Sequence, residues 1–398
     1  MSTISFLNIA MQGRINPTLP LVAELVGRGH TVTYHSSPTY AATLEAAGAT
    51  VLPDPAGDQP PPDPPIPLTL LAALAEGALE GLPTVLDDLR RIKPDLIVHD
   101  ASSLIGAVAA RELGVPAVAL WTTLAFNAAV PSPSRAGADL LRAALRRPRT
   151  AGRLAGARWS LSRRHDTRGL PLVDIAAIRE PLNLVFTSRE FQPDVDSLDG
   201  SFRFVGPSIG ARIQTEPFPF HALRDPVVYV SLGTIFSGDA QLTRTLVRAL
   251  SPLAGTVVLS TGRADPAHLG ELPSNVLAHT HVPQPEVLQH AALFVTHAGM
   301  NSVNESLYAG TPMLLLPQGA DQPDVAQRVV DLGAGLAVPA GSAVASATMS
   351  ALARRLLGEP GFTASAQRMQ ALQHAAGGYV RAADELEAHV STSRASMR

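Results

Sequence analysis

The chain of 398 residues is too long for one hydrophobic core of ordinary size, so two domains are expected. It is 46% hydrophobic and 16% charged with a formal net charge of −3, and this balance lacks the basic excess typical of nucleic-acid-binding proteins. The absence of cysteine excludes disulfides, thiolate catalysis and cysteine-bound metals.

The N-terminal segment favours a first β-strand over a targeting signal. No basic segment precedes its apolar run, and no small-residue cleavage site follows. No uninterrupted apolar run is long enough to span a bilayer, so a cytoplasmic protein without a membrane partner is expected. The twelve histidines are scattered without the spacing of metal ligands, and no metal site is predicted.

Apolar segments typical of strands alternate with helical patterns through the first half of the chain. The predicted helices cover residues 18–28, 39–47 and 103–114. The predicted strands are ISFLNIA, TVTYHSS, TVLP, PDLIVHD, PAVALWT, LNLVFTS and FRFVGPS. Continuous apolar strands linked by helices predict a parallel, doubly wound sheet.

The same alternation restarts after a proline-rich segment, TEPFPFHALRDP. The strands expected there are VVYVSLGT, TVVLST, VLAHTHV, LFVTHAG, PMLLLPQ and GLAVPA, with helices near 239–251, 347–357 and 366–387. The fold class is therefore α/β, with two doubly wound Rossmann-like domains facing each other across a cleft. The expected boundaries are 1–207, a linker 208–225, 226–365, and a C-terminal helix 366–398 packing back on the first domain.

The most informative stretch is LFVTHAGMNSVNESLYAGTPMLLLPQGADQPDVAQRV. A strand ends at Thr296, a tight turn follows, and a helix begins near Asn301-Ser302. Unpaired N–H groups and the helix dipole make such a start an anion site. Gly299 permits close approach of the backbone to an anion, and His297 can donate a hydrogen bond to a phosphate oxygen.

Acidic and amide side chains follow at positions suited to sugar hydroxyls. Glu305 lies about one turn into the helix, where a carboxylate suits the two hydroxyls of a ribose. After the next strand, Asp321 and Gln322 offer an acceptor and an amide. Each residue alone fits an ordinary capped helix with a solvated charge. The ordered set instead predicts a nucleotide-sugar site.

This stretch resembles the donor-binding signature of the family 1, UDP-dependent glycosyltransferases, which have the GT-B fold. It is most similar to the bacterial macrolide-type natural-product enzymes. The resemblance covers essentially the whole chain, because the opening Gly-x-x-Asn-Pro, FVGP, SLGT and HVPQ also fit.

The resemblance implies a role for each matching residue of the donor site. His297 contacts a diphosphate oxygen, Asn301 and Ser302 lie at the α- and β-phosphates, and Glu305 holds the ribose. Asp321 and Gln322 contact the transferred sugar. The remaining implied donor residues are Thr234 near the diphosphate, His281 where plant members have a stacking Trp, Val282 at the base, and Gln284.

The implied activity is inverting, metal-independent transfer of a hexose, expected to be glucose, from a UDP-sugar to a hydroxyl of a small natural product. Such enzymes act in antibiotic biosynthesis or inactivation. The UDP-sugar is a co-substrate and no prosthetic group is implied. Fixed N–H donors, His297 and Thr234 would stabilise the leaving diphosphate without a metal. The chain is expected to be a monomer or a homodimer, with no nucleic-acid partner.

The acceptor side departs from the family pattern at one residue. The family reads Gly-His-(Val/Ile)-Asn-Pro, where the His is the general base and a nearby Asp orients it. Here the position is Arg14, in QGRINP, and a guanidinium stays protonated. The partner carboxylate is matched by Asp100, which ends the strand LIVHD.

Three interpretations of Arg14 remain open. In the first, Asp100 accepts the proton, or His35 or His99 replaces the missing imidazole, although His99 should point to the other side of its strand. In the second, Arg14 binds an anionic acceptor, a carboxylate or phosphate, which needs no base. In the third, the protein is inactive or was altered for study. A plain Arg14–Asp100 ion pair is the simplest form of all three and can coexist with the first two. The first is preferred, narrowly over the second.

The acceptor pocket is expected in the first domain, with Asn16, Trp121 and Phe126 as candidate contacts for a flat or hydrophobic molecule. Trp121 and Phe126 fit the core equally well. Leu124 is expected in the core. The proline-rich loop near residues 60–67 and the helix near 70–82 are the other expected walls.

Other functional classes fit the sequence less well. A nicotinamide dehydrogenase needs Gly-x-Gly-x-x-Gly after its first strand, which is missing here. A nucleotide-sugar epimerase needs acid and base groups at the sugar carbon, and none is identified. A membrane-associated sugar transferase should expose a basic and apolar patch. The arginines at 142–168 are a weak indication of one, and a solvated face is the preferred interpretation of them. Arg14 alone supports a non-catalytic nucleotide-sugar-binding protein.

Overall fold

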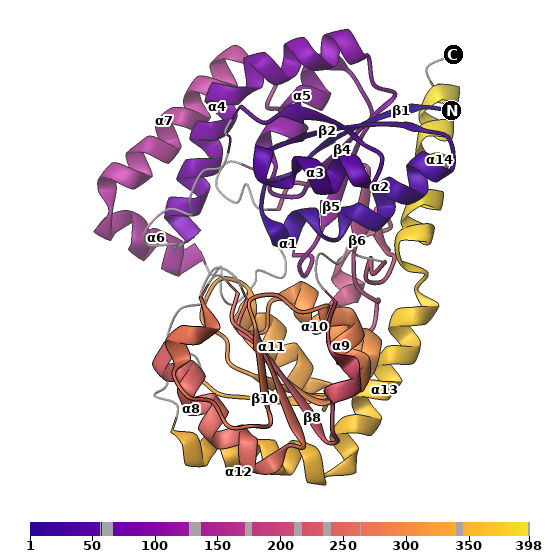
Figure 1. The fold of residues 1–398 in the computed structure, drawn as a ribbon. Coiled ribbons are helices and arrows are strands. Elements are labelled where there is room, and N and C mark those ends of the chain that lie inside the picture. The colour runs from indigo at the N-terminus through magenta and orange to yellow at the C-terminus, as the bar shows by residue number, and fades with distance from the viewer. Residues whose placement is uncertain are drawn as a thin grey trace. The chain divides into compact units, whose positions relative to one another are not determined.

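The computed structural model describes residues 1–55, 57, 67–126, 137–171, 177–210, 217–233, 240–262, 264–339 and 345–396. The chain forms two compact units (Figure 1). The first contains residues 1–210 together with 376–398, and the second contains residues 211–375.

The first unit is built on a seven-stranded parallel sheet of order β3-β2-β1-β4-β5-β6-β7. Apolar residues fill these strands because both faces of the sheet are covered by helices. The strands are β1 (Thr3–Leu7), β2 (Thr31–Ser36), β3 (Thr50–Pro53), β4 (Leu96–Asp100), β5 (Ala117–Trp121), β6 (Leu182–Val185) and β7 (Phe202–Phe204).

The helices of the first unit divide between the two faces of its sheet. Ile4 and Phe6 of β1 point to the face covered by α2 (Thr18–Gly27) and α14 (Gly378–Ser396). Leu7 points to the opposite face, covered by α4 (Pro67–Ile92), α5 (Leu104–Leu113) and α7 (Pro148–Arg164). Alternation along each strand therefore assigns its side chains to one helical layer or the other. The remaining helices are α1 (Gln12–Ile15), α3 (Pro38–Ala46) and α6 (Gly137–Arg146).

The second unit repeats this plan with six parallel strands of order β10-β9-β8-β11-β12-β13. Its strands are β8 (Val227–Ser231), β9 (Thr256–Ser260), β10 (Val276–His279), β11 (Ala291–Thr296), β12 (Met313–Leu315) and β13 (Gly335–Ala337). Its helices are α8 (Ala240–Leu250), α9 (Gln284–His290), α10 (Met300–Ala309), α11 (Gln322–Asp331), α12 (Ser346–Gly358) and α13 (Pro360–Ala375).

Strand order reverses once in each sheet, between β1 and β4 and between β8 and β11. In doubly wound sheets, ligands bind beside the carboxyl ends of the strands at this reversal. The two parallel sheets confirm the predicted α/β, doubly wound class.

The C-terminal helical pattern expected over residues 366–387 is in fact two helices. Gly377 and Gly378 have φ values of +97° and +63°, in the left-handed region that glycine adopts readily, and they separate α13 from α14. Helix α14 belongs to the first unit, where it packs against α2 (Figure 1).

One described helix, α4, is long and apolar enough by length and composition to cross a membrane. The prediction concerned an uninterrupted apolar run, and α4 is not one, because Glu76 and Glu80 interrupt it. Its buried side chains, Leu71 and Leu82 among them, belong to the core of the first unit, as those of a core helix do.

Candidate active site

His297 follows β11 and is held between two glycines of the second unit. A Cβ added at Gly299 would lie 2.4 Å from Nε2 of His297, and one at Gly233 would lie 2.7 Å from its Cε1. Gly233 follows β8, so the imidazole is at the point where the strand order reverses. Both glycines are required because any side chain there would displace the ring.

The electrostatics of His297 follow from its burial. Burial lowers the pKa of His297. The negative charge of Asp321 and a hydrogen bond to the backbone of Ser231 raise it, but burial has the larger effect and the pKa is about 4. The ring is therefore neutral near pH 7. The charge of Asp321 also indicates that the start of α11 is close to the ring.

Two alanines near this imidazole have left-handed backbone conformations. Ala298 has φ of +66° and Ala320 has φ of +55°, values that cost non-glycine residues free energy. They immediately precede Gly299 and Asp321, so each shapes a turn into a helix, α10 or α11. Backbone strain of this kind is concentrated at functional sites.

A polar network joins α9 to α10 behind the turn. Gln284 Nε2 donates to Glu305 Oε2 at 2.7 Å and to Ser302 Oγ at 3.3 Å. Tyr229 of β8 donates its hydroxyl to Gln284 Oε1 at 3.0 Å. The structure thus brings three predicted donor residues together. Sequence reasoning missed Tyr229, because a tyrosine inside an apolar strand carries no signal of a polar role.

The start of α10 provides the anion site expected from the sequence. Gly299 is the residue before the helix and makes no side-chain cap hydrogen bond. Asn301 and Ser302 lie in the first turn, and both are half-buried. The first-turn amides, the dipole and these side chains suit a phosphate.

The last predicted donor residues differ in their surroundings. Gln322 is buried, and its Oε1 accepts hydrogen bonds from the backbone N–H groups of Gln318 at 2.8 Å and Gly319 at 3.2 Å. Its carbonyl therefore shapes the loop before α11. His281 is exposed and Val282 half-buried just before α9, and Thr234 lies outside the described residues.

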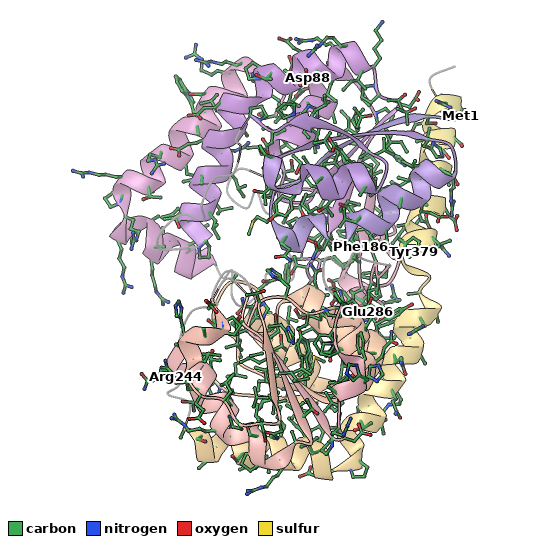
Figure 2. The ribbon with its side chains drawn as sticks, viewed as in Figure 1. Met1, Asp88, Phe186, Arg244, Glu286 and Tyr379 are labelled. Atoms are coloured by element: carbon green, nitrogen blue, oxygen red, sulfur yellow. The ribbon has the colours of Figure 1, made fainter. Side chains whose placement is uncertain are left out.

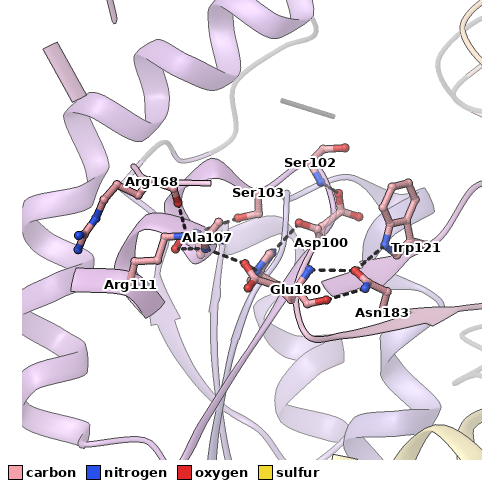
Figure 3. A network of polar contacts seen from close by, with 11 residues as sticks. Asp100, Ser102, Ser103, Ala107, Arg111, Trp121, Arg168, Glu180 and Asn183 are labelled. Atoms are coloured by element: carbon pink, nitrogen blue, oxygen red, sulfur yellow. Dashed lines mark hydrogen bonds and ion pairs between the residues drawn. The ribbon is translucent and has the colours of Figure 1, made fainter. Parts of the chain in front are cut away.

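In the first unit, Arg14 and Asp100 meet at the other strand-order reversal. Arg14 Nη1 donates to Asp100 Oδ2 at 3.2 Å and to Thr122 Oγ1 at 2.5 Å. Asp100 is completely buried, and its Oδ1 accepts from the backbone N–H of Ser102 at 2.7 Å (Figure 3). The Arg14 side chain keeps 21% of its surface exposed, so Arg14 covers the carboxylate. Thr122 was missed by the sequence analysis.

His35 and His99 lie away from this pair. His35 Nε2 is 3.4 Å from Asp88 Oδ2 of α4, on the sheet face opposite α2, and burial lowers the pKa of His35 while Asp88 opposes that shift. The structure does not bring it to Arg14.

His99 contacts Glu180 at 3.1 Å, and Glu180 also accepts from Arg111 at 2.8 Å (Figure 3). Burial raises the pKa of Glu180, but the hydrogen bonds from His99 and Arg111 outweigh it and the pKa ends below its usual value. His99 is therefore part of a structural ion-pair network. It points to the side of β4 away from Arg14, as the alternation of side chains along the strand predicts.

Of the candidate acceptor contacts, Trp121 and Phe126 are buried, as the core alternative for both allowed. Trp121 is 1% exposed, donates Nε1–H to Asn183 at 3.3 Å and packs against Phe202. Phe126 is also buried, and Asn16 is half-buried at the end of α1. The surroundings of Trp121 are those of a core residue. The proline-rich loop at 60–67 lies almost wholly outside the described residues.

The low pKa of His297 predicts a stability effect of acid. Unfolding returns the ring to an ordinary pKa near 6.5, so the unfolded chain binds the proton first and stability falls as pH falls below 6.5. Between pH 7 and 5 the wild-type protein should lose about 2 kcal/mol more unfolding free energy than His297→Gln. Urea unfolding at both pH values measures this, and equal losses would contradict it.

Within the described residues, no group of three or more histidine, aspartate or glutamate side chains is arranged to hold a metal ion. What the two sites offer is hydrogen-bond donors at a helix start and an arginine–carboxylate pair. This chemistry suits a phosphate-bearing ligand on the second unit.

Comparison with known proteins agrees with this geometry. Residues 215–376 match the family model described as UDP-glucoronosyl and UDP-glucosyl transferase. The chain is 35% identical to the oleandomycin glycosyltransferase of Streptomyces antibioticus, over 97% of this chain and 90% of that one. It is 31% identical to the NDP-glycosyltransferase YjiC of Bacillus subtilis (strain 168), over 98% of both chains.

Solved structures give the same result. The crystal structure of the kitacinnamycin glycosyltransferase matches with a TM-score of 0.85 and 29% identity over 98% of both chains. That of the calicheamicin glycosyltransferase CalG4 matches with a TM-score of 0.76 and 28% identity over the same shares. These likenesses confirm the GT-B fold and the resemblance drawn from the donor signature. The chain belongs to the UDP-glycosyltransferase family, and it is a family 1, nucleotide-sugar-dependent glycosyltransferase of the natural-product type.

Proposed function

We propose that this enzyme transfers a hexose, glucose in the first instance, from a UDP-sugar to an oxygen of a small natural product with inversion and without a metal. The observation that carries the proposal is His297, held between Gly233 and Gly299, directly before the start of α10. A phosphate at that position meets backbone N–H groups, the helix dipole and an imidazole. The donor unit is the second one, and the first unit binds the acceptor.

The proposed chemistry follows from charge. As the glycosidic bond breaks, the leaving UDP gains negative charge on its diphosphate. The amides at the start of α10 stabilise that charge, and the negative charge favours the protonated form of His297, in which both ring nitrogens donate. We assign Asn301, Ser302 and Thr234 to the diphosphate, His281 and Val282 to the uracil, and Asp321 and Gln322 to the sugar.

The network around Glu305 predicts a specific loss of nucleotide affinity. Glu305 is buried and is oriented by Gln284 at 2.7 Å, so we assign its carboxylate to the ribose hydroxyls. Glu305→Ala should weaken UDP binding about 10- to 100-fold, as loss of charge-assisted hydrogen bonds does. Isothermal titration with UDP measures it. Glu359→Ala, which removes an exposed carboxylate of the same unit, is the control, and equal affinities in both variants would contradict the assignment.

The acceptor oxygen has two candidates. In the first, a neutral hydroxyl attacks and Asp100 takes its proton, with Arg14 in the place of the family's histidine. In the second, the acceptor is already anionic, a carboxylate or phosphate, and Arg14 binds it. The burial of Asp100 behind a partly exposed Arg14 favours the second, because the exposed guanidinium is what an approaching acceptor meets.

The direct test of the function is turnover. The protein is incubated with UDP-glucose and matched acceptors, such as a benzyl alcohol and the corresponding benzoic acid, and products are read by mass spectrometry. Release of UDP with a mass gain of one hexose on an acceptor supports the proposal. Nucleotide-sugar binding without turnover on any acceptor would support a non-catalytic binding protein instead. We propose a cytoplasmic location for the enzyme.

A further inference from the structure

The helical hairpin of α6 and α7 concentrates positive charge on a chain that is negative overall. Residues 137–168 contain nine arginines, no lysine and two carboxylates, Asp139 and Asp166, so their formal charge is +7 against −3 for the whole chain. Eight of these arginines are exposed, and the ninth, Arg158, is buried. Figure 2 shows long side chains projecting from the outer side of both helices.

Acidic partners of two of these arginines lie among the described residues. Arg153 pairs with Glu76 of α4, and Arg168 pairs with Asp166. The nucleotide site lies on the other unit and the proposed acceptor site uses Arg14. The hairpin charge is therefore not required by either of them.

Large apolar side chains are exposed on the same two helices. Leu141 and Leu145, four residues apart and so on one face of α6, are 62% and 75% exposed, and Trp159 of α7 is 60% exposed. They include three of the six large hydrophobic side chains that the described residues expose, and Met1 at the chain terminus is another.

The outward direction of Trp159 follows from helix geometry. At 100° per residue, Trp159 is opposite Leu154, Ala157 and Leu161, which are buried in the core of the first unit. Arg163, one turn further on, lies over the Trp159 ring at 4.8 Å. An aromatic ring with a guanidinium beside it, on the face away from the core, is typical of side chains at a membrane interface.

We propose that the α6–α7 hairpin docks the enzyme on an anionic phospholipid bilayer. Guanidinium groups bind phosphates with paired hydrogen bonds, and arginines near an anionic surface each add favourable free energy. The exposed leucines and the tryptophan supply the apolar contact that a phosphate-only ligand would not use. A nucleic acid shares the phosphates but offers nothing to Leu141 and Leu145, so the bilayer is the better fit.

The fluorescence of Trp159 can report vesicle binding. The sequence contains two tryptophans, and Trp121 is buried, so a change on vesicle binding reports Trp159. The full chain is mixed with vesicles of phosphatidylcholine containing about 30% phosphatidylglycerol, or with phosphatidylcholine alone. We expect co-sedimentation and a blue-shifted, bromolipid-quenched emission with the anionic vesicles only, both lost at high salt.

Two sets of arginine substitutions test whether vesicle binding depends on the hairpin arginines or only on the total positive charge of the chain. Changing Arg146, Arg147 and Arg149 to Gln should weaken vesicle binding about 100-fold. The same change at Arg189, Arg248 and Arg354, exposed outside the hairpin, should leave it within about 3-fold. Leu141→Ser with Leu145→Ser should weaken binding to the anionic vesicles at low salt, because the two serines remove the apolar contact and leave the charge unchanged. Unchanged UDP affinity and unfolding midpoint show that each variant is folded.

Three outcomes would overturn the proposal. One is equal binding of the two arginine triples, and another is no preference for anionic vesicles. The third is binding of an RNA homopolymer, or self-association abolished by the leucine pair, in the absence of vesicle binding. None of these outcomes depends on turnover, so the vesicle experiments test the membrane proposal independently of the proposed transferase activity.

Discussion

Gly299→Ala should reduce the rate of sugar transfer by about 100-fold or more, with a parallel loss of UDP affinity. The added Cβ would lie 2.4 Å from Nε2 of His297, so the imidazole must leave its position. The backbone tolerates alanine there, because φ at Gly299 is −63°. The loss is then due to crowding of the ring and not to backbone strain. Steady-state transfer rates and UDP titration measure it.

A matched substitution tests the cause of that loss. Gly361, in α13 of the same unit, has nothing within 4 Å of an added Cβ, so Gly361→Ala should leave transfer within about 2-fold of wild type. The expectation for Gly299 is contradicted if Gly299→Ala binds UDP as tightly as Gly361→Ala does. Nucleotide would then lie elsewhere, and the donor assignments would fail with it.

Arg14→His should raise transfer to a neutral hydroxyl acceptor by at least about 10-fold. The substitution places an imidazole beside Asp100, whose Oδ2 now accepts from Arg14 at 3.2 Å. An imidazole oriented by a buried carboxylate can take the acceptor proton, which a guanidinium cannot. The initial rate with the benzyl alcohol, read by mass spectrometry, is the measurement.

The same variant distinguishes the two proposed acceptor classes. If Arg14 binds a carboxylate, Arg14→His should raise KM for the benzoic acid about 10-fold or more, and Arg14→Lys should retain part of the affinity. If Asp100 is the base, Asp100→Ala should nearly abolish transfer to the alcohol. A wild-type rate in Asp100→Ala excludes that role, and no gain in Arg14→His contradicts the expectation for the position.

The strands could be predicted because parallel strands buried on both faces are continuous apolar runs. Each of the thirteen segments expected to be a strand overlaps a strand of the structure, from ISFLNIA with β1 to GLAVPA with β13. The C-terminal break was missed because the pattern on either side of Gly377 and Gly378 is equally helical, although the glycine pair is itself a signal that a helix ends. Periodicity reports which face is buried more reliably than where a helix stops.

The candidate sites were predictable where a motif spans neighbouring residues. His297, Gly299 and Glu305 lie on one turn and one helix, so their sequence spacing already fixes their proximity. Thr122 bonds to Arg14 across 108 positions and Tyr229 to Gln284 across 55, and no local pattern encodes such pairs. For Trp121 the sequence left a pocket and a core position equally open, because its contact with Phe202 joins residues 81 positions apart.

The second unit leaves the first after Gly210 and returns to it at Ala376. These two crossings are neighbours, since Gly378 donates its N–H to Val205 at 2.6 Å and a Cβ on Gly210 would lie 3.7 Å from the Tyr379 ring. The second unit is thus an insertion whose two ends lie side by side in the first unit. Under the proposed division of donor and acceptor sites, exchanging residues 211–375 for those of a relative should combine the relative's donor preference with the acceptor choice of this chain.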